Sequence, residues 1–554
     1  MKYIFSIALI ISAIVTKNYA QSESLDLVAI KALIADQSQA NARGLEVGIV
    51  HNQEIVLEWY GGLASLEHNA AVDSKTRFNL ASVAKQFTAL MILDLEGKGK
   101  LDLNSDIRDY FPELFPEIKL PITLQQLLNH TSGIRDAYDL MSIQGDPWWK
   151  RPGLDNQDVF KLLTQQNSLN FNPGEAYMYS NSGYTLLALI IEQISQKPFI
   201  DFAESWFKDL GMNSTGFTDN YMAVVPNKAF PYSDWGNGIW QAYPMLTNLN
   251  GDGFLFSTLR DQLYWEQLLQ SEAGLGNSVI KKSQNPIENS VASHYGYGVE
   301  HNKLYGKNSV NHSGSTGSYG ARFIRFPEQN LAIVVMSNNS NIWVEGLANQ
   351  IAKTLVQNPN NTEQLAYATM PEVIGNTPVL EQTLGTYKLE GDGTVIEIVR
   401  LGDDLYREIE GTDPVRLIPV RGNVYVYETI PDLKLAFVPN ANGEGEYDFK
   451  LYHPTIATRL ATRQPYLDLS PNLLEKANGT YYNQELDVEF SLRYSQEDMF
   501  QVSLQDDSFN ATWIAPGSIQ MGNYLIQANY NATGEITSFS LNYTRIQGLL
   551  FTRK

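Results

Sequence analysis

A serine and a lysine one helical turn apart, Ser82 and Lys85, constrain this chain more than any other feature of its sequence. Residues i and i+3 lie on one face of a helix, so the two side chains can meet without help from the rest of the fold. A serine hydroxyl is a poor nucleophile near neutral pH and needs an adjacent base. Lys85 can be that base only if burial lowers its pKa, and the apolar residues that follow it, such as Phe87 and Leu90, favour burial. The pair predicts a nucleophilic serine in the first turn of a buried helix, where unpaired backbone N–H groups favour a developing oxyanion.

A Ser-x-x-Lys sequence alone occurs often by chance, but a second motif, Tyr179-Ser180-Asn181, follows it here. This motif lies between a Pro-Gly turn and an apolar run over 184–194 that predicts a buried helix. Side chains on such a connector can reach a cleft. Tyr179 is therefore a candidate proton carrier, provided that Lys85 lowers its pKa, and Asn181 is a candidate partner for a substrate amide. In isolation, the segment is better explained by a tyrosine packed under a loop and a helix-capping asparagine.

The third motif is His312-Ser313-Gly314, which precedes two strand-like runs over 321–326 and 331–336. A turn over 327–330 joins these runs, so the pattern predicts a hairpin whose second strand is central in a sheet. Glycine at a strand edge lets a substrate backbone approach closely.

A hairpin is also predicted near the N-terminus, where 45–50 and 55–59 are strand-like and flank a short turn. Together, the two hairpins predict one antiparallel sheet. We expect a helical lobe to hold Ser82 and Tyr179, and a cleft to separate that lobe from the sheet.

The three motifs resemble the active site of the class C β-lactamase, DD-peptidase and esterase superfamily of serine hydrolases. The resemblance covers roughly Leu25 to Val356 and includes two more familiar segments, Leu127–Ile134 and Gly251–Thr258. It implies an α+β fold with an antiparallel sheet and a helical lobe, and it implies a role for each motif residue. These roles are nucleophile for Ser82, acid–base pair for Lys85 and Tyr179, substrate binding for Asn181, His312 and Gly314, and an oxyanion hole from the backbone N–H groups of Ser82 and Ser315. The segment around His130 is expected to be structural, and this chemistry needs no cofactor and no metal.

His312 departs from the β-lactamase pattern, which commonly has lysine at this place. A histidine near neutral pH holds only part of a positive charge, which weakens the case for substrates with a free carboxylate. Histidine here is similar to the family's D-aminopeptidases, D-amino-acid amidases and some esterases.

The composition of the C-terminal third differs from that of the preceding sequence and predicts all-β structure. Asn358–Thr362 and Ile374–Pro378 have the composition of a linker, and the segments beyond them are short and rich in Val, Ile, Tyr and Phe. Gly385-Thr386-Tyr387 recurs 94 residues later as Gly479-Thr480-Tyr481, which indicates an internal repeat. We therefore predict a hydrolase domain over 21–358 and two small β-barrels over 376–465 and 470–554, similar to the layout of the family's D-aminopeptidases. The alternative is a single lipocalin-like barrel built from both halves.

Composition favours an exported protein. Met1-Lys2-Tyr3 precedes an apolar run over 4–15 that is too short to span a bilayer comfortably, so 1–20 is predicted to be a signal peptide cleaved after Ala20. An N-terminal anchor helix is the alternative. The chain has no cysteine, which excludes disulfides and thiol catalysis. Its net charge of −21 over 554 residues argues against nucleic-acid partners and anionic membrane surfaces, and we expect a periplasmic or secreted protein without a membrane span after processing.

Three functions remain open at this point. The first is a serine hydrolase that acts on D-amino-acid amides, peptides or small esters. The second is a DD-carboxypeptidase or β-lactamase with the same active site. The third is a catalytically inactive binding protein. The sequence leaves open the identity of the small-molecule or peptide substrate, its stereochemistry and the oligomeric state.

Overall fold

The computed structural model describes most of the chain. The described residues are 25–37, 44–234, 238–271, 277–356, 380–389, 395–402, 404–408, 414–428, 433–440, 447–453, 456–463, 475–496, 499–505, 507–515 and 517–554. The predicted signal peptide and both predicted linker segments lie outside these residues. No helix in the described part of the chain is long and apolar enough to cross a membrane.

A six-stranded antiparallel sheet forms the centre of the N-terminal region, with the order β10-β11-β12-β13-β1-β2. Its strands are β1 (Leu45–His51), β2 (Glu54–Gly61), β10 (Glu300–Leu304), β11 (Lys307–Thr316), β12 (Tyr319–Phe326) and β13 (Leu331–Ser337). Both predicted hairpins are present, and β1 pairs with β13, so the two ends of this region close one sheet. The prediction of an antiparallel sheet is confirmed.

Ten helices accompany the sheet in the described residues. They are α1 (Leu27–Gln37), α2 (Lys85–Gly97), α3 (Leu124–Leu128), α4 (Ala137–Ile143), α5 (Asn156–Thr164), α6 (Asn181–Ser195), α7 (Phe199–Leu210), α8 (Leu259–Ser271), α9 (Asn277–Ser283) and α10 (Val344–Val356). Helices α1 and α10 pack on one face of the sheet through one apolar cluster. Helix α8 packs on the opposite face, where Gly48 of β1 leaves room for Leu259 and Leu263.

Short strands complete the helical lobe. They are β3 (Leu63–Ser65), β4 (Ala70–Ala71), β5 (Phe78–Asn79), β6 (Gly216–Phe217), β7 (Tyr232–Ser233), β8 (Gln241–Ala242) and β9 (Leu255–Ser257). Strand β9 pairs with both β5 and β6, which fixes the chain just before Ser82. A 3₁₀ turn, η1 (Ala81–Ala84), follows and continues directly into α2.

Two separate closed barrels of eight antiparallel strands form the C-terminal third. The first contains β14 (Gly385–Leu389), β15 (Val395–Leu401), β16 (Asp404–Glu408), β17 (Val415–Arg421), β18 (Val424–Tyr427), β19 (Lys434–Pro439), β20 (Tyr447–His453) and β21 (Ile456–Arg463). The second contains β22 (Gly479–Asn483), β23 (Val488–Gln496), β24 (Met499–Leu504), β25 (Asp507–Ala515), β26 (Ser518–Met521), β27 (Tyr524–Tyr530), β28 (Ile536–Tyr543) and β29 (Ile546–Arg553). In each barrel the last strand pairs with the first, which leaves no exposed sheet edge. The predicted all-β C-terminal region is confirmed, and the alternative of one barrel built from both halves is wrong.

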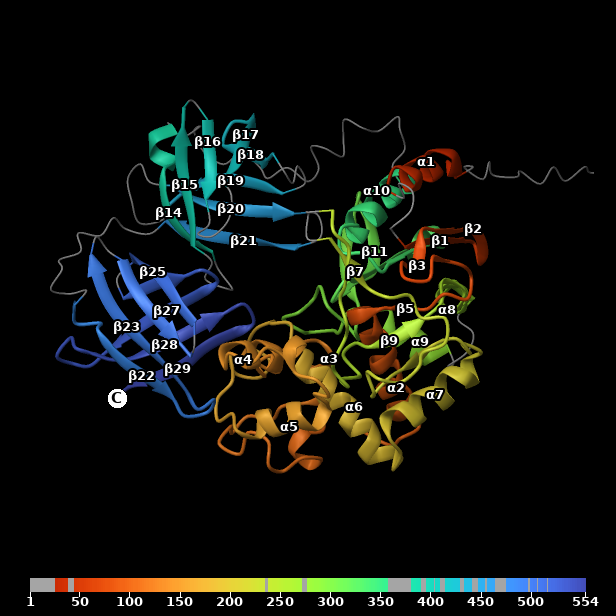
Figure 1. The fold of residues 1–554 in the computed structure, drawn as a ribbon, viewed down its shortest axis with the longest axis horizontal. Coiled ribbons are helices and arrows are strands. Elements are labelled where there is room, and N and C mark those ends of the chain that lie inside the picture. Colours follow the sequence, from red (N-terminus) through yellow and green to blue (C-terminus); the bar gives the residue numbers. More distant parts are fainter. Residues whose placement is uncertain are drawn as a thin grey trace, which may run out of the picture.

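The internal repeat appears in the packing of both barrels. The hydroxyl of Tyr387 donates to the carbonyl of Thr383 at 2.8 Å, and Tyr481 donates to Ala477 at 2.9 Å. In each barrel, an arginine of the last strand lies opposite this tyrosine in the strand register. The arginine side chain lies against the glycine two residues before the tyrosine. Each glycine has a positive φ angle, which a residue with a side chain rarely adopts. Figure 1 shows the second barrel next to α4 of the helical lobe, while the first barrel lies above it in this view.

Candidate active site

Ser82 and Lys85 lie together at the start of α2. The Nζ atom of Lys85 is 3.1 Å from the Oγ atom of Ser82, the distance at which a proton can pass between them. Ser82 is half-buried, whereas Lys85 is fully buried. The two other atoms that Lys85 contacts are the Oδ1 of Asn181, at 2.8 Å, and the carbonyl oxygen of Asp252, at 2.7 Å. All three acceptors are neutral, so the ammonium has no directly bound carboxylate.

Burial lowers the pKa of Lys85 from 10.5 to about 8. The carboxylates of Asp252 and Asp136 oppose this shift, and Arg545 adds to it. A lysine with a pKa near 8 is partly neutral at physiological pH, as a general base must be. Lys85 is therefore buried and has a lowered pKa, which is what a general base at this position requires.

The backbone around Ser82 is tightly fixed. Ala81 has a φ angle of +46°, a left-handed conformation that residues with a β-carbon adopt at a cost. Its N–H donates to the Oδ1 of Asn79 at 2.8 Å, which helps to hold that conformation. Strand β11 passes so close that a β-carbon on Gly314 would lie 2.3 Å from the carbonyl oxygen of Leu80 and 3.0 Å from the amide nitrogen of Ser82. Glycine is therefore required at this crossing, where the sequence predicts the oxyanion hole.

The strand that carries the third motif has one edge without a strand partner beyond Asn311 in the described register. Strand β10 pairs with β11 only as far as Asn311. Beyond that point, His312 to Thr316 pair with β12 on one side and, in the described register, with no strand on the other. Ser315 is exposed on this segment. An extended substrate can add to such an edge through main-chain hydrogen bonds.

Tyr179 lies over Lys85, with the Nζ atom 4.9 Å from the centre of its ring. Within the described residues, its buried hydroxyl has no hydrogen-bond partner. Burial raises the pKa of Tyr179 above its usual range, and the nearby Ser82 hydroxyl opposes this rise only in part. The condition set for Tyr179, a pKa lowered by Lys85, is therefore not met. Tyr179 stays protonated and is placed to give a proton rather than to take one.

Asn181 is the first residue of α6, and its backbone and side chain face different partners. Its N–H donates to the Oδ2 of Asp136 at 2.6 Å, and its Oδ1 accepts from Lys85. Asp136 is fully buried, and its other oxygen accepts from the N–H of Tyr138. Asp136 thus connects the start of α4 to the start of α6.

His312 is buried, and its ring nitrogens are both engaged. The Nδ1 atom lies 2.6 Å from the carbonyl of Ser313, which can only accept, so this nitrogen carries the proton. The Nε2 atom then accepts from the hydroxyl of Tyr295 at 2.9 Å. Burial lowers the pKa of His312 to about 3, and the charge of Lys85 adds to the effect. The ring is neutral at physiological pH, so it lacks even the partial charge that the sequence led us to expect.

Several residues of this constellation were not among the sequence candidates. Asp252 contacts Lys85 through its carbonyl, and its Oδ2 accepts from Tyr138 at 2.8 Å. The signal for Asp252 was present in the Gly251–Thr258 segment. Asp136 and Tyr295 had no comparable signal, because their partners are distant in sequence. His130 stacks on Tyr179 with ring centres 4.2 Å apart, and its Nδ1 accepts from the N–H of Ser180, which fits the expected structural role.

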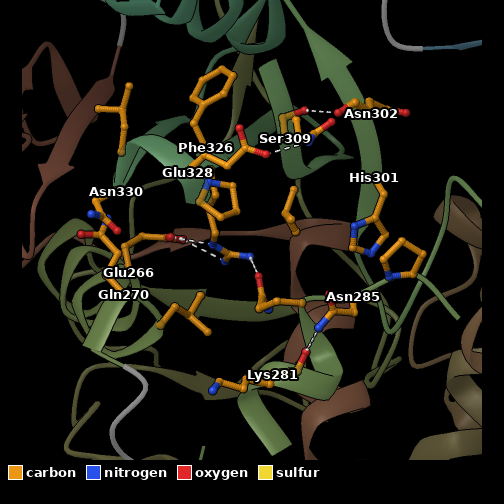
Figure 2. A pocket seen from close by; sticks show the side chains of 18 of the residues that line it. Glu266, Gln270, Lys281, Asn285, His301, Asn302, Ser309, Phe326, Glu328 and Asn330 are labelled. Atoms are coloured by element: carbon orange, nitrogen blue, oxygen red, sulfur yellow. Dashed lines mark hydrogen bonds and ion pairs between the residues drawn. The ribbon is translucent and has the colours of Figure 1, made fainter. Parts of the chain in front are cut away.

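A separate cavity of about 780 Å³ lies behind α2, between α8, α9 and strands β10 to β12. Figure 2 shows its lining residues, including Glu266, Asn285, His301 and Ser309. None of the predicted site residues lines it. Its closest link to the hydrolytic centre is Gln86, the neighbour of Lys85, whose Oε1 accepts from Arg325 of the cavity wall at 2.6 Å. Within the described residues, no group of three or more His, Asp or Glu side chains is arranged to hold a metal ion.

Comparisons with known proteins agree with this arrangement. The Beta-lactamase family model matches residues 30–353. Penicillin-binding protein 4* of Bacillus subtilis (strain 168) is 27% identical over 377 residues, which cover 65% of this chain and 82% of that protein. A D-aminopeptidase of Cereibacter sphaeroides (strain ATCC 17029 / ATH 2.4.9) is 26% identical over 328 residues, which cover 57% of this chain and 61% of that protein. The chain thus spans about three fifths of the length of that D-aminopeptidase.

Solved structures share the fold. The octameric penicillin-binding protein homologue from Pyrococcus abyssi superposes with a TM-score of 0.55 at 22% identity, covering 79% of this chain and all of that one. The D-amino acid amidase from Ochrobactrum anthropi SV3 superposes with a TM-score of 0.50 at 21% identity, covering 61% of this chain and 99% of that one. Because the family model spans more than half of the sequence and the three motifs meet in one place, this chain belongs to the beta-lactamase family and is a serine hydrolase.

Proposed function

We propose that this chain is an exported hydrolase that forms an acyl-enzyme on Ser82 and acts on D-amino-acid amides or peptides, or on small esters. One observation carries the proposal: the 3.1 Å contact between the Ser82 hydroxyl and a buried lysine whose pKa is lowered to about 8. A serine next to a partly neutral amine has the activated nucleophile that acyl transfer needs.

The reaction would begin when neutral Lys85 takes the Ser82 proton and Oγ attacks the carbonyl carbon of the substrate. The oxyanion would be held by the N–H groups of Ser82 and Ser315, on the two segments that touch at Gly314. Tyr179, protonated, would donate to the leaving amine or alkoxide and recover its proton from Lys85. Water would then attack the acyl-enzyme with Lys85 again as base, and Asn181 would orient the substrate amide.

The substrate class follows from His312. A neutral imidazole offers no charge to a substrate carboxylate, so neutral amides and esters are favoured over peptides that end in a free carboxylate. Similarity to a protein named D-aminopeptidase and to a D-amino acid amidase supports the same class.

The second candidate is a DD-carboxypeptidase or β-lactamase, which the similarity to penicillin-binding protein 4* favours. A hydrolysis panel separates the two. It would compare D-alanine p-nitroanilide, its L-isomer, p-nitrophenyl butyrate, a D-Ala-D-Ala peptide and a chromogenic cephalosporin, with Ser82→Ala as the blank. We expect the D-anilide or the ester to be turned over fastest. Fastest turnover of the peptide or the cephalosporin would establish the second candidate instead.

A catalytically inactive binding protein is the remaining alternative. Incubation with a fluorophosphonate, followed by peptide mass spectrometry, distinguishes it from both hydrolases. We expect a single adduct on Ser82. An unmodified protein with no turnover of any substrate in the panel would favour the inactive alternative.

Export is the part of the proposal that rests on the N-terminal sequence alone. We expect the mature protein from a bacterial host to begin at Gln21, as N-terminal sequencing of the periplasmic or secreted fraction would report. Retention of residues 1–20 in a membrane fraction would instead favour the anchor helix.

A further inference from the structure

One hairpin turn of the second barrel contacts the start of α4 in the hydrolytic lobe. Strands β28 and β29 are joined by Thr544 and Arg545, and Arg545 enters the acidic start of α4. Its Nε and Nη2 atoms donate to the two oxygens of Asp139 at 3.0 and 2.9 Å. Its Nη1 atom lies 3.2 Å from the Oδ2 of Asp136. One guanidinium therefore binds two carboxylates of the lobe.

The contact with Asp136 leads directly to the hydrolytic centre. The Asp136 oxygen that Arg545 contacts also accepts from the N–H of Asn181, and the Asn181 side chain accepts from Lys85. Three consecutive contacts of 3.2, 2.6 and 2.8 Å thus connect a barrel side chain to the proposed base. The first two contacts share the Oδ2 of Asp136, and the last two share the residue Asn181.

The charge of Asp136 makes this connection sensitive to Arg545. Burial raises the pKa of Asp136 to about 6, and Arg545 is the largest opposing influence. The carboxylates of Asp139 and Asp252 push the same pKa upward. Without the guanidinium, a buried carboxylate that faces two others would take up a proton and become a poorer acceptor for the Asn181 N–H.

The first barrel serves as an internal comparison, because it is a copy of the second in the same chain. Between β20 and β21, the sequence has Pro454 and Thr455 and no arginine. Tyr543 pairs with Ile546 in the second barrel just as His453 pairs with Ile456 in the first. The arginine is thus not part of the barrel repeat.

The turn of the second barrel is also strained. Thr544 has a φ angle of +36°, which is rare for a β-branched residue. Its hydroxyl donates to the same Asp139 carboxylate that Arg545 binds, which offsets part of that strain. Unfavourable backbone conformations of this kind persist where surrounding contacts hold them, often at functional sites.

We propose that Arg545 is a positioning residue of the hydrolytic site, which keeps Asp136 ionised so that Asp136 fixes the start of α6 and holds Asn181 against Lys85. The second barrel is then part of the active centre rather than an appended binding module. This inference rests on the proposed function, because it assumes that Lys85 and Ser82 carry the reaction.

The test is a double-mutant cycle on the full chain, with p-nitrophenyl butyrate and D-alanine p-nitroanilide as substrates. Arg545→Met is expected to lower kcat/KM by about 30- to 100-fold, the scale for misplaced catalytic groups. Arg545→Lys restores a charge and should recover part of this loss. Asp136→Asn imitates the protonated carboxyl, so it should reproduce the loss on its own. The double variant should lose less than about threefold beyond Asp136→Asn, because the two changes remove one interaction.

A matched control separates positioning from docking of the barrel. Glu485 forms the other ion pair of the same interface, 3.2 Å from the Nη1 of Arg135, and its side chain also accepts from Ser168. Glu485→Gln keeps one acceptor oxygen, loses the ion pair with Arg135 and makes no change to Asp136. We expect it to change kcat/KM by less than about threefold, since it alters the interface without altering the site.

The outcomes distinguish the inference from the proposed function. Equal losses in Arg545→Met and Glu485→Gln would mean that docking alone matters, and fully additive losses in the double variant would mean that Arg545 does not act through Asp136. Either result overturns the inference. If Arg545→Met fails to fold, Asp136→Asn still tests it, because Arg545 remains in place there and full activity would overturn the role of the Asp136 charge. Activity that survives Ser82→Ala would instead overturn the proposed function.

Discussion

Two buried cations lie near the start of α2, and they differ in what surrounds them. Lys85 contacts a hydroxyl, a side-chain amide and a carbonyl oxygen. Arg325 of β12 binds both oxygens of Glu266, at 2.6 and 2.9 Å. Arg325 also donates to Gln86 and stacks 4.0 Å from the ring of Phe323. Both cations are almost completely removed from solvent.

The difference teaches how one protein makes one buried cation reactive and another structural. A buried charge is costly unless a partner of opposite charge compensates it. Lys85 has only neutral partners in contact, so burial shifts its equilibrium toward the neutral amine that can accept a proton. Arg325 has a bidentate carboxylate partner and five fixed donors, and it holds the sheet, α8 and α2 together. The reactive cation, Lys85, and the structural cation, Arg325, thus lie near the same helix, because Arg325 contacts Gln86.

The largest expected effect is the loss of activity when Lys85 is replaced. Lys85→Met should lower kcat/KM by about 10³-fold or more, as expected when a general base is lost. It should leave the unfolding temperature unchanged or raise it, because an uncompensated buried charge is removed. Steady-state kinetics and thermal unfolding on the same preparation test both parts. Lys98→Met, on the exposed end of the same helix, is the control. A variant that loses activity and stability together would contradict the comparison.

Breaking the ion pair between Arg325 and Glu266 should lower stability rather than activity. Glu266→Gln leaves Arg325 without its carboxylate, and we expect a loss of about 3–5 kcal/mol in the free energy of unfolding, the scale for a broken buried pair. Activity per folded molecule should change little. Denaturant unfolding and active-site titration measure the two quantities.

The control for Glu266 is a surface pair of the same kind. Glu489→Gln breaks the exposed ion pair with Lys554 and should change the free energy of unfolding far less than Glu266→Gln. If both substitutions cost the same, burial would not be what distinguishes the structural pair.

The pH dependence sharpens the comparison on the side of Lys85. The base works only when neutral, so kcat/KM should rise with pH and level off above about 8. The folded pKa of Lys85 lies below its unfolded value of 10.5, so the unfolded chain binds more protons between these two values. The stability of the wild type relative to Lys85→Met should therefore increase as pH rises from about 8 to 10.5. A pH-independent difference between the two proteins would show that Lys85 is not perturbed.

The smallest expected effect comes from placing a further cation near Lys85. His312→Lys should raise the ratio of activity on carboxylate-bearing substrates to activity on neutral ones by about tenfold, the value of one charge-assisted hydrogen bond. It should also move the acid limb of the pH profile below 8, because a like charge near Lys85 lowers its pKa further. His312→Gln controls for the loss of the ring. An unchanged substrate ratio would remove the role proposed for His312 in specificity.

Much of the fold and of the proposed site could be predicted because the relevant signals are local. The i, i+3 spacing of Ser82 and Lys85, the glycine of the third motif and the alternation of the strands all act within a few residues. The repeat at Gly385 and Gly479 was visible because each barrel begins in the same way. The resemblance to a known family then supplied the order in which these local pieces meet.

The electrostatics could not be predicted, because they depend on groups that are distant in sequence. A role for Tyr179 as proton carrier was made conditional on a pKa lowered by Lys85, and His312 was expected to keep part of its charge. Burial instead raises the pKa of Tyr179 and lowers that of His312. Burial of a particular atom depends on everything packed around it, so no short segment determines it.

By itself, the sequence determined which groups are available for chemistry, where the sheet and the barrels lie, and that two barrels follow the hydrolase region. Only the tertiary structure decided that Lys85 is buried against neutral acceptors within the described residues, that His312 is buried, and that Arg545 of the last hairpin meets Asp136 more than 400 residues away. The physical reason is the distance over which each kind of interaction acts. Helix and strand patterns arise from neighbours along the chain, whereas the energy of a charge depends on every neighbour in space.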